Sequence, residues 1–153
     1  MTNDRILNHR LSPLLPRPNG YCKTASFSAV RTRIMTTDKT LIYHNPRCSK
    51  SRETLQILED NHLQPDIVEY LEDPPTAQEL KRIIAMLGIS ARELLRNTEP
   101  VYKEADLDDD GLSDDDIIEA ICEYPALMQR PIVISGNRAV IGRPPSRVLE
   151  IIA

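Results

Sequence analysis

Short β-rich runs alternate with amphipathic segments from residue 40 onward. Thr40–His44 (TLIYH) predicts a strand, which ends before Asn45-Pro46 because a proline interrupts the regular backbone of a strand or a helix. Residues 49–61 predict a helix, since apolar side chains recur three positions apart on one face. Residues 66–70 (DIVEY) predict a second strand. The organised part of the chain therefore opens with a β-α-β unit.

Helix-capping signals dominate the middle of the chain. A Ser or Thr stands three positions before an acid, the spacing of a capping box, at Thr76 and Glu79, Ser90 and Glu93, and Ser113 and Asp116. The first pair precedes apolar residues at i, i+3, i+4 and i+7, and Gly88 closes that helix. The second pair opens a short helix that runs through Arg96, and the third opens a helix whose isoleucines face inward.

The C-terminal part predicts a hairpin followed by a helix. Residues 131–135 (PIVIS) and 138–142 (RAVIG) are β-rich runs separated by Gly136-Asn137, a two-residue turn signal. Apolar side chains share one face over residues 146–152, which predicts a closing helix. The order is β-α-β, a helical insert, then β-β-α. This order predicts an α/β fold with a thioredoxin-like core that carries a helical insertion.

The first 35 residues differ from the rest in charge and pattern. They contain one acid, Asp4, against six basic residues, Arg5, Arg10, Arg17, Lys23, Arg31 and Arg33. A basic, acid-poor segment is typical of a transit peptide, but no amphipathic helical period accompanies it here. We therefore interpret residues 1–35 as a disordered tail or a start codon assigned too early, because Met35 directly precedes the first organised segment. Residues 36–153 form one domain, in keeping with a chain of 153 residues.

Composition argues against several classes of protein. The net charge of −4 and the aromatic content of 4% disfavour nucleic-acid binding, since an acidic surface repels phosphates and few rings are available for stacking. No apolar run has the ~20 residues of a membrane-spanning helix. Cys22, Cys48 and Cys122 are an odd number at unrelated spacings, which supports neither a disulfide framework nor a zinc site. We expect a soluble, monomeric protein in the reducing cytoplasm.

Cys48 is the candidate nucleophile. It stands at the N-terminal end of a predicted helix, where unpaired N–H groups favour the thiolate over the thiol. Arg47, Lys50 and Arg52 add positive potential. His44, at the end of the strand, and Ser51, three residues on, are expected to reach the sulfur and to lower its pKa further. The alternative, a buried structural cysteine, fits poorly because the loop is polar.

The other two cysteines are expected to be bystanders. Neither Cys22 in the basic segment nor Cys122 in an acidic helix has a positive local field. Cys48-Ser49-Lys50-Ser51 has the form of a Cys-x-x-Cys motif whose second cysteine is serine. Because no resolving thiol is in place, an external thiol must complete a redox cycle at Cys48.

Residues 106–111 (DLDDDG) match the first half of a calcium-binding EF-hand loop. The twelfth position of that loop requires a bidentate Glu and is Ile117 here, and the eighth, which should be apolar, is Ser113. We interpret the acids as a solvated linker before a helix N-terminus and expect no metal site.

Three arginines, Arg96, Arg130 and Arg143, stand at the predicted ends of elements. A planar guanidinium can hold two oxygens of an oxyanion at once, which a lysine cannot. Any one of them alone is equally consistent with a surface ion pair or with a charge opposing a helix dipole. The sequence does not show whether they converge, so an oxyanion site at these three residues is a hypothesis.

Several motifs, taken in order, resemble those of the glutaredoxin-dependent arsenate reductases. The matching segments are IYHNPRC at 42–48 followed by Ser51-Arg52, YLE at 70–72, RPIV at 130–133 and GRP at 142–144. The resemblance runs from about Leu41 to the C-terminus and excludes the first 35 residues. It implies that Cys48 attacks arsenate and that His44 and Ser51 lower its pKa. It also implies that Arg96, Arg130 and Arg143 bind the oxyanion and that Pro131 is a cis-proline.

The same resemblance implies that no cofactor is bound and that glutathione is a co-substrate. Glutathione attacks the cysteine-bound arsenic, glutaredoxin reduces the adduct, and arsenite leaves. Well-characterised members follow the cysteine with Gly-Thr, whereas this chain has Ser49-Lys50, as do chromosomal relatives. The alternatives are a glutathione-dependent thiol reductase with another substrate and a redox regulator that binds RNA polymerase and resembles the Spx proteins. The Spx-like regulators usually carry a Cys-x-x-Cys motif, whereas this chain has Ser51 in place of the second cysteine.

Overall fold

The structure, a computed structural model, describes residues 39–152 of the chain. A four-stranded mixed sheet with strand order β2-β1-β3-β4 forms its centre. The strands are β1 (Thr40–His44), β2 (Asp66–Glu69), β3 (Ile132–Ser135) and β4 (Arg138–Ile141). β1 is parallel to β2 and antiparallel to β3, which forms a hairpin with β4. The predicted α/β fold and its order of strands are confirmed. The predicted extension, residues 1–35, and Cys22 within it lie outside the described residues.

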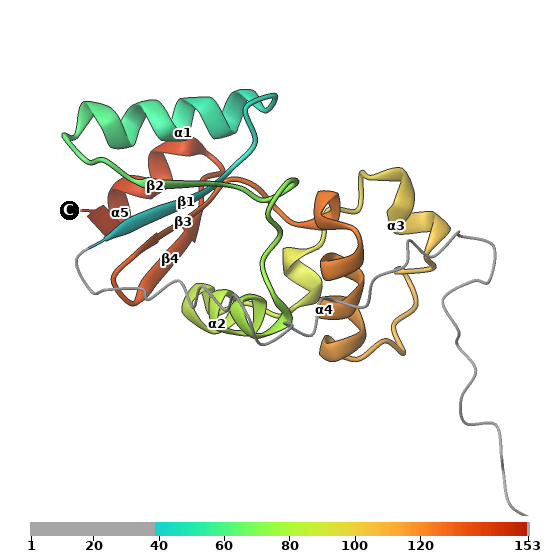
Figure 1. The fold of residues 1–153 in the computed structure, drawn as a ribbon. Coiled ribbons are helices and arrows are strands. Elements are labelled where there is room, and N and C mark those ends of the chain that lie inside the picture. The colour runs from blue at the N-terminus through green and yellow to red at the C-terminus, as the bar shows by residue number, and fades with distance from the viewer. Residues whose placement is uncertain (1–38, 153) are drawn as a thin grey trace, which may run out of the picture.

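Helices cover both faces of the sheet (Figure 1). One face carries α1 (Ser49–Asp60), the 3-10 turn η3 (Pro145–Val148) and α5 (Leu149–Ile152), and the other carries α2 (Ala77–Leu87). The alternation of side chains along β1 explains this arrangement, because successive residues of a strand point to opposite faces. Ile42 packs with Leu58 of α1, whereas Tyr43 packs with Leu80 of α2. The sheet is therefore buried on both faces.

The helical insertion between β2 and β3 begins with α2 against the sheet, and the rest of it lies beyond the end of the sheet at which β1 leads into α1 (Figure 1). After α2 it contains η1 (Arg92–Leu94), α3 (Pro100–Glu104), α4 (Asp114–Glu123) and η2 (Pro125–Leu127). The predicted inward-facing isoleucines of α4, Ile117, Ile118 and Ile121, are buried in the same core cluster as α2. This packing fixes α4 against α2 at the end of the sheet near which β1 leads into α1.

All three predicted capping pairs form their reciprocal hydrogen bonds, and two of them open the predicted helices. Thr76 Oγ1 accepts a hydrogen bond from the N–H of Glu79 at 3.2 Å, and Glu79 Oε2 accepts one from the N–H of Thr76 at 2.8 Å. Ser113 and Asp116 make the same reciprocal pair at the start of α4. Gly88 ends α2 with φ of +66°, a left-handed conformation that glycine adopts without strain.

The third pair does not open the helix predicted to run through Arg96, so that prediction was wrong. Ser90 and Glu93 form their hydrogen bonds, but only one 3-10 turn follows, and it ends at Leu94. Leu95 is extended because it pairs with Met128 in an antiparallel bridge. The closing helix likewise starts as a 3-10 turn, and α3 and η2 were not predicted.

The Arg92 side chain holds the acidic stretch before α4 in place. Arg92 Nη1 donates to the Leu107 carbonyl at 3.0 Å, and its Nη2 donates to the Asp109 carbonyl at 2.8 Å. Within residues 39–152, no three side chains of His, Cys, Asp or Glu gather as a metal-binding group. Over the same residues, none of the helices has the length and apolar character needed to cross a membrane.

Candidate active site

Cys48 is held at the start of α1 by a short loop, which we call the Cys48 loop (residues 44–52). Cys48 is the N-cap residue of α1, with extended backbone angles, and its N–H donates to the Asn45 carbonyl at 3.0 Å. The N–H of Asn45 donates to Ser51 Oγ at 2.9 Å, and Asn45 Oδ1 accepts from the N–H of Arg47 at 2.9 Å. These bonds close the loop on itself and fix the position of the sulfur.

The surroundings of the sulfur favour the thiolate. Burial raises the pKa of the Cys48 thiol, but the N–H of Ser51, the Arg130 guanidinium and the N–H of Lys50 outweigh it, so the pKa lies below its ordinary value. The two N–H groups belong to the first turn of α1, as expected for a helix N-terminus. Cys48 is only partly buried, so the activated sulfur remains accessible.

His44 and Ser51 are both buried in the Cys48 loop, but their side chains contact each other. Ser51 Oγ lies 2.9 Å from His44 Nδ1. Burial lowers the pKa of His44, with Glu69 opposing the shift, so the neutral imidazole is favoured and Nδ1 can accept from the hydroxyl. Ser51 acts on the sulfur through its backbone N–H rather than through its hydroxyl. The two side chains therefore stabilise the loop.

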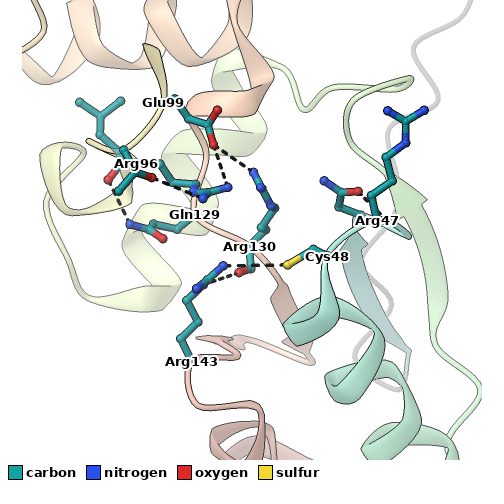
Figure 2. A network of polar contacts seen from close by, with 10 residues as sticks. Arg47, Cys48, Arg96, Glu99, Gln129, Arg130 and Arg143 are labelled. Atoms are coloured by element: carbon teal, nitrogen blue, oxygen red, sulfur yellow. Dashed lines mark hydrogen bonds and ion pairs between the residues drawn. The ribbon is translucent and has the colours of Figure 1, made fainter. Parts of the chain in front are cut away.

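The structure brings Arg96, Arg130 and Arg143 together, and we call these three residues the arginine cluster. Arg130 and Arg143 lie beside Cys48, and Arg96 lies on the far side of Arg130 (Figure 2). Arg143 Nη2 lies 4.0 Å from Cys48 Sγ, the long limit for a hydrogen bond to sulfur, and Arg143 Nε donates to the Arg130 carbonyl at 2.8 Å. Burial lowers the pKa of Arg96, and the nearby charges of Arg130 and Arg143 lower it further. The three guanidiniums thus form one positive region.

A short backbone pairing, which we call the neck (residues 94–96 and 127–129), positions two members of the cluster. The N–H of Arg96 donates to the Leu127 carbonyl at 2.7 Å, and the N–H of Gln129 donates to the Leu94 carbonyl at 2.9 Å. Gln129 Nε2 donates to the Leu95 carbonyl at 3.1 Å. Arg96 and Arg130 therefore lie near each other although α3, α4 and η2 separate them in sequence.

The position of Arg143 depends on a close contact of the backbone at Gly142. A Cβ at this position would come 2.6 Å from Thr54 Oγ1 and 2.8 Å from Pro131 Cγ, closer than real atoms approach. Gly142 also donates its N–H to the Pro131 carbonyl at 2.9 Å. The end of β4 can thus pass directly against α1 and Pro131, which brings Arg143 to Cys48. The Arg130–Pro131 peptide bond is cis, as the resemblance implied.

Glu99 belongs to the site and was not predicted. Its Oε1 lies 3.0 Å from Arg96 Nη1 and 3.7 Å from Arg130 Nη1. The sequence offered one signal, the spacing of three between Arg96 and Glu99, which is also common on exposed surfaces. Tyr70 was also missed: burial raises the pKa of its phenol, and the charge of Arg130 opposes this shift.

The cations next to Cys48 in sequence do not make up the positive region. Figure 2 shows the Arg47 side chain pointing away from the arginine cluster. Lys50 Nζ pairs with Glu53 Oε2 at 3.0 Å, and Arg52 Nη1 donates to the Pro46 carbonyl at 2.8 Å. Cys122 is in α4, where its thiol contacts the Pro75 carbonyl.

Comparison with known proteins identifies a family in which this combination of elements recurs. The model of the ArsC family matches residues 43–151. The chain is 51% identical over 117 residues to the uncharacterized protein YfgD of Escherichia coli, covering 76% of this chain and 98% of that one. It is 49% identical to an arsenate reductase of Haemophilus influenzae over 113 residues, 73% of this chain and 97% of that one.

The fold matches solved structures as well. An arsenate reductase from Vibrio cholerae superposes with a TM-score of 0.74 at 47% identity, covering 76% of this chain and 100% of that one. The match includes the strand-to-helix loop with its cysteine, since the family model begins within β1 and extends into α5. The chain belongs to the ArsC family.

Proposed function

We propose that the protein reduces arsenate to arsenite, with Cys48 as the nucleophile and the arginine cluster as the oxyanion site. The observation that carries this proposal is a thiol of lowered pKa with the Arg130 guanidinium against it and Arg143 Nη2 4.0 Å away. A thiolate beside several guanidiniums suits an oxyanion that is both bound and attacked. The arsenate reductase relatives support arsenate as the substrate.

Donors for an oxyanion are available beside Cys48. Arg130 Nε is buried and has no hydrogen-bond partner among residues 39–152, although buried donors in proteins are usually paired. The side chain of Arg130 is only 16% exposed, so its charge is little screened by water. An anion at this point would satisfy the buried donors and offset the mutual repulsion of the guanidiniums.

The proposed reaction begins when the Cys48 thiolate attacks arsenic. A sulfur–arsenic bond forms, one arsenic–oxygen bond breaks, and the oxygen leaves as water after taking up protons from solvent. The guanidiniums stabilise charge on the remaining oxygens. The thiol of glutathione then replaces a second hydroxyl group on arsenic, which again leaves as water.

Reduction requires a second external thiol, because position 51 is serine. A glutaredoxin thiolate attacks the glutathione sulfur, forming a mixed disulfide. The electron pair of the sulfur–arsenic bond passes to arsenic, which becomes arsenic(III). Water then hydrolyses the bond to Cys48 and releases arsenite together with the free thiol. No cofactor has to be bound for these steps, and glutathione serves as co-substrate.

The direct test is a coupled assay in which arsenite formation is measured with arsenate, glutathione and glutaredoxin present. We expect turnover that needs all three components and is lost in Cys48→Ser. Absence of turnover in the wild type would refute arsenate as the substrate. The protein should then be assayed on glutathionylated substrates, since the activated thiol supports that alternative equally well.

A further inference from the structure

Glu99 directs its carboxylate at the arginine cluster instead of capping its own helix. It is the N-cap residue of α3, a position whose side chain, most often Ser, Thr, Asp or Asn, can accept a backbone N–H of the first turn. Its side chain makes no such bond. Its Oε1 instead lies within ion-pair distance of Arg96 Nη1 at 3.0 Å and Arg130 Nη1 at 3.7 Å (Figure 2).

The same guanidiniums are the ones that the proposed function assigns to the oxyanion. The Arg130 guanidinium acts on the Cys48 thiolate at one side and pairs with Glu99 at the other. An oxyanion held by Arg96 and Arg130 beside Cys48 would therefore share its guanidiniums with the Glu99 carboxylate. Both ion pairs use Oε1, so Glu99 Oε2 takes part in neither of them.

Two anions that share a guanidinium repel each other unless a proton lies between them. The side chains of Arg96 and Arg130 are each 16% exposed and that of Glu99 is 23% exposed, so water screens this repulsion poorly. A protonated oxygen on the bound oxyanion would donate a short, charge-assisted hydrogen bond to the carboxylate. A fully ionised oxyanion has no such proton and would leave two negative groups in contact.

We propose that Glu99 selects oxyanions that carry a proton, hydrogen arsenate and hydrogen phosphate, over fully ionised tetrahedral anions such as selenate and sulfate. Selenate matches arsenate in shape and sulfate matches phosphate, but at neutral pH neither carries a proton. Glu99 is thus a specificity residue: its carboxylate attracts protonated oxyanions and repels fully ionised ones. This inference rests on the proposed function, in which the arginine cluster holds the oxyanion beside Cys48.

The test measures how well each anion protects Cys48 from a neutral alkylating reagent. Iodoacetamide labelling is quantified on the peptide that contains Cys48, with phosphate, sulfate, arsenate or selenate added at matched ionic strength. We expect wild type to be protected by phosphate and arsenate at concentrations about ten- to a hundredfold lower than by sulfate and selenate, the ratio that one charge-assisted hydrogen bond supplies.

Three variants separate selectivity from positioning. In Glu99→Gln the ratio between protonated and fully ionised anions should fall toward one, because the repulsion of sulfate is removed and the carboxylate acceptor is lost. Glu99→Asp retains a carboxylate and should keep the preference while binding every anion more weakly. Glu104→Gln, at the exposed other end of α3, removes the same charge and should leave the ratio unchanged.

The outcomes are distinguishable. If no oxyanion protects wild-type Cys48, the arginine cluster is not an oxyanion site, and the proposed function fails together with this inference. If phosphate protects but sulfate protects equally well, the inference alone is overturned, without recourse to any variant. If Glu99→Gln weakens all four anions by the same factor, Glu99 only positions the arginines and selection is refuted.

Discussion

The Cys48 loop and the arginine cluster meet at one sulfur but are built in opposite ways. The loop is contiguous, and its hydrogen bonds join residues at most seven positions apart, such as His44 and Ser51. The cluster takes one arginine from the insertion, one from the start of β3 and one from the end of β4. The nucleophile therefore depends on local geometry, whereas its charged surroundings depend on the packing of the whole domain.

The sharpest way to distinguish the contribution of the Cys48 loop from that of the arginine cluster is to remove the sulfur. Cys48→Ser should lower arsenate turnover by at least about a thousandfold, since a hydroxyl at this site is a far weaker nucleophile than a thiolate. Protection from proteolysis and the unfolding midpoint should stay close to wild type. Cys122→Ser is the matched control and should retain activity. Turnover that survives in Cys48→Ser would mean that another thiol does the chemistry.

The cluster should be sensitive to geometry as well as to charge. Arg96→Lys, Arg130→Lys and Arg143→Lys keep the charge but lose the paired donors, so each should lower arsenate turnover about ten- to a hundredfold. Iodoacetamide labelling of Cys48 without substrate should change little. Arg47→Lys provides the control, because the Arg47 side chain points away from the cluster. Wild-type turnover in all three variants would assign the arginines a structural role.

The contact that brings the arginine cluster to the Cys48 loop can be strained at Gly142. In Gly142→Ala the added methyl group meets Thr54 and Pro131, and we expect the free energy of unfolding to fall by about 1–3 kcal/mol, as for other overpacked sites. Turnover should fall too, because Arg143 is displaced. Urea denaturation measures the first effect. Gly111→Ala is the control, since the nearest atom to its methyl group would be Asp109 Oδ1 at 3.1 Å, a looser contact than those at Gly142. Equal losses in both variants would contradict the special role of this contact.

The smallest effect concerns the pH dependence of the thiol. Because the pKa of Cys48 is lowered, the rate of alkylation should rise through a midpoint below that of a free cysteine, and the thiolate should persist to lower pH. Arg130→Gln removes one of the groups that lower the pKa and should move the midpoint upward. Lys50→Gln should not, because Lys50 acts on the sulfur through its backbone N–H. Identical midpoints in wild type and Arg130→Gln would place the source of the shift in the helix N-terminus alone.

The difference between the local contacts of the Cys48 loop and the long-range contacts of the arginine cluster also explains how far the sequence could predict the structure. β1, the hairpin, the helix that begins after Cys48 and two capping boxes were predicted because each signal lies within a few residues. The neck was not, since nothing near Leu95 in the sequence reveals its pairing with Met128. That pairing ended the predicted helix early.

The site shows the same division. Cys48 at a helix N-terminus was predicted correctly from its neighbours. The contact between the His44 and Ser51 side chains was not predicted, because it depends on how the loop closes. The role of His44 in lowering the pKa of Cys48 stays a prediction. Glu99 escaped notice because its partnership with Arg130 exists only in the folded chain. The oxyanion-binding role of the arginine cluster stays a prediction.

The neck has a consequence for how such a protein can change over time. Since the segment from α3 to η2 leaves and re-enters the domain at one paired point, its exposed loops can be lengthened or shortened without moving Arg96. Lengthening a flexible loop there costs only about 0.6 kcal/mol for each doubling of its length. A slip of one residue within the neck would instead turn Arg96 to the opposite face. New sequence can therefore be inserted in the exposed loops between α3 and α4 while the geometry at Cys48 is preserved.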